Sequence, residues 1–353
     1  FADWIPGIAS SADDICLVRS MHTDAFNHHP GQLLLFTGSQ QFGRPTLGAW
    51  SIYGLGSESQ NLPGFVVLSS GVGTSGGATN FSSGFLPSTY QGTPLRSSGD
   101  PILYLSNPPG ISSESQRAGL DALRDLNQMH QTSAGDVEIA ARIASYELAY
   151  RMQTAGPELV DFSKESAATQ ESYGLNNPKT RQHGTNCLLA RRLVERGVRY
   201  VMLMNASWDN HTQLNKKLKE NCDATDQPTG ALLQDLKQRG LLDSTLVVWG
   251  GEFGRTPVSE IRNSMEEGNA GRDHHPNAYS MWLAGGGIQG GQVVGKTDEL
   301  GFFITEDPVH IHDLQATILH TLGFDHTRLT YRHMGRDFRL TDVAGNVVRK
   351  MLS

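Results

Sequence analysis

The stretch Val248-Trp-Gly-Gly-Glu-Phe-Gly-Arg-Thr-Pro257, with Gly271-Arg-Asp-His-His-Pro276 some twenty residues later, says most about the fold of this chain. The first stretch begins at the end of an apolar run that predicts a buried strand over 245–249. A glycine-rich loop follows this strand directly. The second stretch precedes another apolar run, which predicts a strand over 279–284. Open α/β sheets carry their chemistry in loops at the carboxyl ends of hydrophobic strands. We therefore expect a functional site in these loops.

A third segment repeats the arrangement. The apolar run 198–204 predicts a strand, and Trp208-Asp-Asn-His211 follows it directly. Carboxylates and imidazoles are the side chains that bind Zn²⁺ and related divalent cations. The three loops together contribute six candidate site residues, namely Asp209, His211, Glu252, Arg255, Asp273 and His274.

Composition limits the class of protein. The 353 residues, 38% hydrophobic and 18% charged, are enough for one large α/β domain or two smaller ones. A net charge of −7 gives no basic surface for nucleic acid. No apolar run approaches the roughly 18 residues that a membrane span needs. The three cysteines form no C-x-x-C pair and cannot all be bonded to one another.

The order of apolar runs predicts a mainly parallel sheet. Strand-like and helix-like patterns alternate in the second half of the chain, which is typical of right-handed crossovers. Residues 69–112 are rich in Gly, Ser and Pro and predict long surface loops, whereas 113–195 predict a largely helical insertion. The expected strands are 15–18, 65–68, 198–204, 245–249 and 279–284, and the later helices are 180–196, 226–239 and 311–322.

Each candidate residue also has a structural interpretation. Asp209 and His211 form, in isolation, a turn with a solvated histidine. Glu252 is either a site carboxylate or half of an ion pair with Arg255. Of His274 and the adjacent His275, only one can face the site if the backbone is extended, because neighbouring side chains then point to opposite faces.

His28 is a further candidate at the start of a predicted helix. It follows Asn27 and precedes Pro30, and the N-terminus of a helix favours anions. Its side chain is interpreted as a metal ligand, as a catalytic acid or base, or as a hydrogen-bonded structural histidine.

Short runs spread along the chain carry a family resemblance. The chain resembles the family called domain of unknown function 1501 over essentially its whole length. The runs are Ser20-Met-His-Thr-Asp24, Asn27-His-His-Pro30, Thr37-Gly-Ser-Gln-Gln-Phe-Gly-Arg-Pro45, Tyr53-Gly-Leu-Gly56, Gly250-Gly-Glu-Phe-Gly-Arg255, Asp273-His-His-Pro276, His310-Ile-His-Asp313 and Gly335-Arg-Asp-Phe-Arg-Leu-Thr341.

The resemblance implies a fold. The family is regarded as part of the alkaline phosphatase and sulfatase superfamily, which implies one α/β domain over 1–353. Its central sheet would be mainly parallel, with helices on both faces and one or two divalent metals at the strand ends. Family members usually begin with an export signal and a first strand that supplies an aspartate ligand. The resemblance therefore implies a periplasmic or extracellular protein, and a chain that lacks this first strand.

Two departures narrow the expectation. Sulfatases share a Cys-or-Ser-x-Pro-x-Arg motif, and none of Cys16, Cys187 and Cys222 lies in such a motif, so a formylglycine sulfatase is not expected. The superfamily's Asp-His pair for a second metal is here Glu252-Phe253. This change predicts either a one-metal site or a two-metal site built in another way.

The leading hypothesis is a metal-dependent hydrolase of small-molecule or polysaccharide phosphate or sulfate esters. Asp209, His211, Asp273 and His274 would bind the metal, with Zn²⁺ first and Ca²⁺, Mg²⁺ or Mn²⁺ as alternatives. The expected catalytic residues are Glu252, Arg255 and His28. The competing hypotheses are a non-catalytic protein that binds carbohydrate or an anionic polymer through loops 69–112, and a scaffold protein of the cell envelope.

Overall fold

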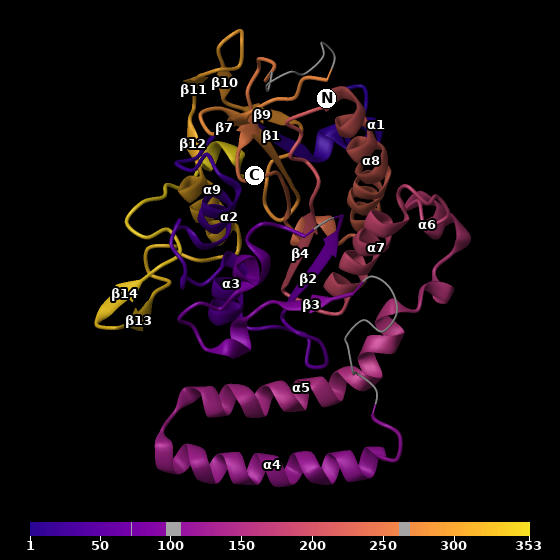
Figure 1. Cartoon of the computed structure of the whole chain (residues 1–353), viewed down its shortest axis with the longest axis vertical. Helices are drawn as coiled ribbons and strands as arrows, with labels where there is room; N and C mark the ends of the chain where they lie inside the picture. The colour runs from indigo at the N-terminus through magenta and orange to yellow at the C-terminus, as the bar shows by residue number, and fades with distance from the viewer. Residues whose placement is uncertain (72, 97–106, 261–268) are drawn as a thin grey trace.

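Two β-sheets lie between layers of helices, and a long helical hairpin projects from this body (Figure 1). The computed structural model describes residues 1–71, 73–96, 107–260 and 269–353. The hairpin consists of α4 (Ser113–Ala134) and α5 (Val137–Val160). None of the described helices is both long and apolar enough to cross a membrane.

The first sheet is mixed. Its central strand β1 pairs in parallel with β12 and β9 and antiparallel with β8, for example Cys16 with Leu283. β5 then pairs antiparallel with β8. The strands are β12 (Val309–His310), β1 (Ile15–His22), β8 (Tyr279–Ala284), β5 (Val247–Trp249) and β9 (Gln292–Val294).

The second sheet is parallel throughout. β2 (Phe65–Ser70) lies between β3 (Thr93–Leu95) and β4 (Tyr200–Asn205). Val66 and Leu68 face the hydrophobic cluster that includes Leu189 and Leu193 of α7 (Arg181–Glu195). The alternate side chains of β2 face a second cluster on the other side. A strand buried on both faces needs an almost continuous apolar run, which is why the sequence revealed β2 and β4.

The expected single, mainly parallel sheet is not confirmed. All five predicted strands form, but β2 and β4 belong to one sheet and β1, β5 and β8 to the other. β8 is also antiparallel to both of its neighbours. The physical reason is that β4 is the edge strand of one sheet and β5 is an edge strand of the other, and these two strands are not hydrogen-bonded to each other. The fold shown is therefore a mixed α/β arrangement.

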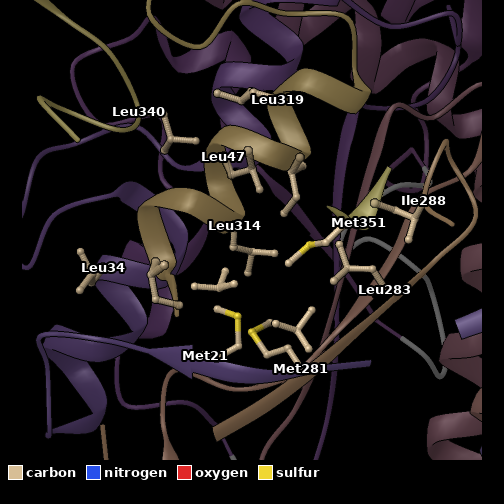
Figure 2. Close-up of a cluster of buried hydrophobic side chains, with 14 of the residues drawn as sticks. Met21, Leu34, Leu47, Met281, Leu283, Ile288, Leu314, Leu319, Leu340 and Met351 are labelled. Atoms are coloured by element: carbon tan, nitrogen blue, oxygen red, sulfur yellow. The ribbon is translucent and has the colours of Figure 1, made fainter. Parts of the chain in front are cut away.

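Helices cover both faces of the first sheet. On one face, Ile15 and Trp282 pack against Leu233 and Leu236 of α8 (Leu214–Gln238). On the other face, Met21, Met281 and Leu283 pack against side chains from three helices (Figure 2). These helices are α2 (His28–Thr37), α3 (Leu47–Leu55) and α9 (Ile311–Thr321), which contribute Leu34, Leu47, Leu314 and Leu319.

Helix α8 begins earlier than the sequence predicts. It starts at Leu214 and continues through Pro228, whereas the sequence pattern predicted a helix over 226–239. Proline removes one backbone hydrogen bond from a helix interior. Packing compensates here, because Gly230 lies directly against Gly7 and Asp226 accepts hydrogen bonds from Gly7 N and Ile8 N at 2.7 and 2.8 Å.

The region between β2 and α7 contains loops and then helices. The described parts of 69–112 hold β3 and two short 3-10 helices, Gly77–Phe81 and Ser88–Tyr90. Residues 72 and 97–106, which also belong to the predicted loops, lie outside the described residues. Helices α4, α5 and α6 (Ala167–Ser172) precede α7.

A buried cation joins α7 to α8. The Arg191 side chain is only 2% exposed and forms ion pairs with Glu165, Glu195 and Asp235 at 2.7, 2.6 and 3.0 Å. Removing one member of a buried ionic group leaves the others desolvated without compensation, which is strongly destabilising.

We predict that Arg191→Ala lowers the free energy of unfolding by about 3–5 kcal/mol, because three carboxylates lose their shared cation. Arg332→Ala is the control, since that side chain is 67% exposed and pairs with Asp337; its loss should be about 0–1 kcal/mol. Urea unfolding followed by circular dichroism measures both. Equal losses would contradict a structural role for the buried ion pairs.

Candidate metal centre

Four segments from distant parts of the sequence meet at one end of the sheets. His28 is the first residue of α2, Asp209 and His211 follow β4, and Glu252 follows β5. The short strands β6 (Gly254–Arg255) and β7 (His274–His275) pair antiparallel, which sets Arg255 opposite His274. The structure thus brings together candidates that the sequence separates widely.

Three imidazoles converge on one carboxylate oxygen. Oδ1 of Asp209 lies 2.8 Å from His211 Nε2, 3.2 Å from His28 Nε2 and 3.3 Å from His274 Nε2. The Nε2 atoms of His211 and His274 are 3.1 Å apart. Donor atoms of His28, Asp209 and His274 lie close enough together to hold a metal ion.

The other nitrogen of each ring is fixed by an acceptor. His28 Nδ1 lies 2.6 Å from Glu252 Oε1, and His211 Nδ1 lies 2.6 Å from Glu260 Oε2. His274 Nδ1 lies 2.7 Å from the carbonyl oxygen of Phe26. A carbonyl or carboxylate can only accept, so each Nδ1 carries the proton and donates it. In the neutral rings, all three Nε2 atoms therefore present a lone pair.

The backbone conformation decides which of the two adjacent histidines reaches the centre. His274 and His275 lie on a short strand, so their side chains point in opposite directions. His275 is buried, and its Nε2 donates to Phe302 O at 2.9 Å. His274 is the site residue of the pair, and His275 holds a neighbouring loop.

Glu252 lies behind His28. Its Oε1 also accepts a hydrogen bond from Gln32 Nε2 at 3.2 Å. The hydrogen bond to Glu252 raises the pKa of His28 above its ordinary value, although partial burial opposes the shift. Burial raises the pKa of Glu252, but the hydrogen bonds from His28, the backbone and Gln32, together with the charge of His28, outweigh it, and the net shift is downward. The two side chains thus form a partly buried, hydrogen-bonded dyad.

Phe253 occupies the position at which the superfamily's Asp-His pair has its histidine. Its ring packs against His274 at 4.3 Å and against His28 at 5.0 Å between centroids. It therefore forms an apolar wall beside two imidazoles and limits how far their rings can turn.

Arg255 lies at the edge of the centre. Its Nη2 donates to Asp209 Oδ1 at 2.5 Å, and its Nη1 donates to the carbonyl of Arg272 at 3.1 Å. Burial raises the pKa of Asp209, but the hydrogen bond and charge of Arg255 act in the opposite direction, and the pKa falls well below its usual range. Asp209 is therefore ionised at neutral pH.

A second group of potential ligands adjoins the first. It consists of His211, Glu260 and Asp273. Asp273 thus joins this second group and not the one around Asp209, and it also accepts a hydrogen bond from His274 N at 2.8 Å. Glu260 was not predicted from the sequence, because no recognisable pattern surrounds it; backbone hydrogen bonds to Gly271 hold it in place. Gln32 was not predicted for the same reason.

The comparisons with known proteins identify a family and distantly similar solved structures. A family described as "Protein of unknown function (DUF1501)" matches residues 1–352. No protein of curated function matches the sequence. The crystal structure of the PsFucS1 sulfatase from Pseudoalteromonas sp. is 13% identical and covers 90% of this chain, with a TM-score of 0.42. This chain spans 62% of that sulfatase's length, and a likeness this low carries no argument about activity.

We predict that, in protein treated with a chelator, His28 titrates above the ordinary value of about 6.5 and that Glu252→Gln lowers its pKa. A raised pKa means that the interaction stabilises the fold fully below about pH 6.5 and that this contribution is lost as pH rises through the folded-state pKa. NMR titration of the imidazole signals measures the shift. His183 is the control, since burial lowers its pKa to about 4 and Glu252→Gln should leave it unchanged. A His28 pKa that does not respond to Glu252→Gln would contradict the dyad.

Proposed function

The chain belongs to the DUF1501 family, whose function is unknown, and we propose from its own residues that it is a metal-dependent hydrolase of phosphate or sulfate esters. The observation that carries this proposal is the convergence of three imidazole Nε2 atoms on Asp209 Oδ1. An arrangement of this kind favours a divalent cation at its centre.

This preference for a cation follows from the hydrogen bonds of the three Nδ1 atoms. With the proton on each Nδ1, the neutral rings direct three lone pairs at an ionised carboxylate, which is repulsive. Consistent with this, His28 Nε2 is buried and has no partner in hydrogen-bond geometry among the described residues. A divalent ion would be held by these four atoms and would replace the repulsive contacts with attractive ones.

The spacing of the donor atoms fits a compact metal shell. A tetrahedral Zn²⁺ site with bonds of about 2.0–2.1 Å sets its ligand atoms roughly 3.3 Å apart. The three Nε2 atoms lie 2.8 to 3.3 Å from Asp209 Oδ1, which is close to that value. Carboxylates and carbonyls behind ligating imidazoles are also the usual partners that fix the ring orientation. We therefore propose His28, His211, His274 and Asp209 as the ligands, and Zn²⁺ as the metal.

This ligand set revises two sequence-based roles. Glu252 contacts His28 Nδ1, so we assign it the orientation of that ligand, not ligation or direct base catalysis. Asp273 lies in the adjoining group with His211 and Glu260, so we place it outside the ligand set. Glu260 orients His211 in the same way that Glu252 orients His28.

Arg255 is the residue suited to the substrate anion. When bound, a divalent ion would supply Lewis-acid polarisation of an ester oxygen, which it would accept as a fifth ligand beside the four protein atoms. The Arg255 guanidinium lies beside Asp209 and is partly exposed, and its planar donors match two oxygens of a phosphate or sulfate group. Its role is to bind and orient the ester next to the metal centre.

The competing function is non-catalytic binding of a carbohydrate or an anionic polymer. It shares the metal centre and the arginine but not turnover. Measurement of both metal content and hydrolysis on the same preparation therefore separates the two functions.

We predict that His274→Ala reduces bound zinc from about one equivalent to less than a tenth, because loss of one ligand leaves three and exposes the site to water. Inductively coupled plasma mass spectrometry after dialysis gives the metal content. His320→Ala is the control, since this exposed histidine lies on α9. Wild-type protein that binds no divalent metal, or equal metal content in the two variants, would exclude the proposed centre.

We predict that Arg255→Gln raises KM for 4-nitrophenyl phosphate or 4-nitrophenyl sulfate by about tenfold or more, because one charge-assisted pair with the anion contributes about 1.5–3 kcal/mol. Zinc content should stay near one equivalent, since Arg255 is not a ligand. Arg328→Gln, at an exposed arginine, is the matched control. Metal-loaded wild-type protein that hydrolyses neither ester but binds an anionic polysaccharide would favour the non-catalytic function.

A further inference from the structure

Two of the sequence runs quoted above meet at a place outside the candidate metal centre. The runs are 37–45 and 335–341. Arg44 of the first run lies over the ring of Phe338 of the second, with 4.5 Å between the guanidinium carbon and the ring centroid. Arg336 lies over the same ring at 4.6 Å. One aromatic ring therefore brings two arginines together.

The ring of Phe338 is held by other aromatic rings. It ends the hairpin formed by β13 (Tyr331–His333) and β14 (Arg336–Phe338), which lies at the edge of the molecule (Figure 1). Phe85 packs against Phe338 with 5.0 Å between centroids and stacks on the ring of His333 at 4.9 Å. These contacts limit the movement of the Phe338 ring, and so of the two guanidiniums that lie over it.

Three guanidiniums share one carboxylate at this place. Arg336 Nη2 donates to Asp342 Oδ1, and Arg44 Nη2 lies 3.8 Å from Asp342 Oδ2. Arg339 contacts only the backbone of the same residue, because its Nε donates to the Asp342 carbonyl. In the described part of the chain, no other carboxylate forms an ion pair with any of these three arginines. Three positive charges therefore surround one negative charge, although the net charge of the chain is −7.

Arg44 has the clearest need for an anion. Its side chain is 17% exposed, and its contact with Asp342 is too long for a hydrogen bond. Among the residues that the structure describes, its guanidinium finds no other acceptor. Burial lowers the pKa of Arg44, the charge of Asp342 opposes this shift, and the charge of Arg336 adds to it. Since a guanidinium keeps its proton in proteins, an added anion is what would stabilise this half-buried cation.

We propose that Arg44, Arg336 and Arg339 form a binding site for one sulfate or phosphate group. The planar donors of a guanidinium match two oxygens of such a group, and all three arginines keep N–H donors that Asp342 does not use. Asp342 competes with the ligand for Arg336 and thereby lowers the affinity of the site.

This anion site is separate from the candidate metal centre. The two share no residue, and β14 and β7 lie in different parts of the molecule (Figure 1). The inference therefore does not depend on the metal or on the proposed activity. The bound group is either a free inorganic ion or a substituent of an anionic polymer, and both present the same oxygens to the arginines.

NMR titration with sodium sulfate and with sodium phosphate at constant ionic strength tests the site through the arginine Nε–H signals. All forms carry Arg255→Gln, so that anion binding at the candidate metal centre does not contribute. We expect Arg336→Gln to weaken binding about tenfold or more, because one charge-assisted pair with the anion is lost. Arg332→Gln is the matched control, since Arg332 lies on the same hairpin but pairs with Asp337 at 3.2 Å.

Dextran sulfate, with unsulfated dextran as its control, identifies the source of the group by calorimetry on the same variants. Binding of dextran sulfate alone assigns the site to an anionic polymer, whereas binding of the inorganic ions assigns it to a free ion. Both outcomes support the site if Arg336→Gln weakens binding and Arg332→Gln does not. Absence of binding by all of these probes, or equal effects of the two substitutions, would overturn the proposal.

A second variant separates anion binding from a structural role of the arginines. Asp342→Asn removes the competing carboxylate and keeps the backbone carbonyl that holds Arg339. Asparagine also suits the positive φ of 49° at this position. We expect the anion to bind severalfold more tightly, because Arg336 is released and the local positive charge rises. If the three arginines only stabilise the fold, Asp342→Asn will leave anion binding unchanged, and the proposed site is wrong.

Discussion

The single oxygen Oδ1 of Asp209 sets the arrangement of the candidate site, because three imidazoles and one guanidinium contact it. Three imidazole nitrogens and the Arg255 guanidinium lie within 3.3 Å of that atom. Each imidazole comes from a different segment, so the start of α2, the loop after β4 and strand β7 must all meet there. The fold provides this meeting point because the strands end at one side of the molecule.

The hydrogen-bond acceptors behind the imidazoles are as important as the oxygen in front of them. Glu252, Glu260 and the Phe26 carbonyl determine which nitrogen of each ring is protonated. Phe253 then limits rotation of two of the rings. A set of ligands that is already oriented loses little freedom when it binds an ion, so the geometry favours tight binding.

Sequence alone predicted the elements of the fold better than their assembly. The apolar runs located β1, β2, β4, β5 and β8, because strands buried on both faces leave a strong local signal. Which strands pair is decided by contacts between distant residues, and no local pattern showed that β8 is antiparallel or that β4 and β5 lie in different sheets. Packing against α1 (Pro6–Ala9) likewise keeps α8 helical on both sides of Pro228, whereas the sequence pattern predicted that this helix begins at residue 226.

The candidate site was predictable to a similar extent. Asp209, Glu252, Arg255 and His274 were found because each follows or precedes a strong strand signal. The grouping of Asp273 with Glu260, and the position of Glu252 behind His28, depend on side-chain directions that spacing does not specify. Alternation along an extended backbone did predict that only one of His274 and His275 would face the site, but tertiary contacts decided which one.

The projecting hairpin and the candidate metal centre differ in how well they tolerate amino-acid substitutions. Helix α4 packs along α5, away from the two sheets, and its Leu126 and Met129 are 62% and 72% exposed (Figure 1). Side chains on that face of α4 touch few others, so an exchanged residue there disturbs little beyond this outer helix of the arm. Met152 and Leu159 of α5, by contrast, are buried in the cluster that includes Leu189 of α7. The candidate metal centre has no such tolerance, because an acceptor fixes the Nδ1 atom of each ring. Divergence within the chain can thus concentrate in the arm and leave the chemistry unchanged.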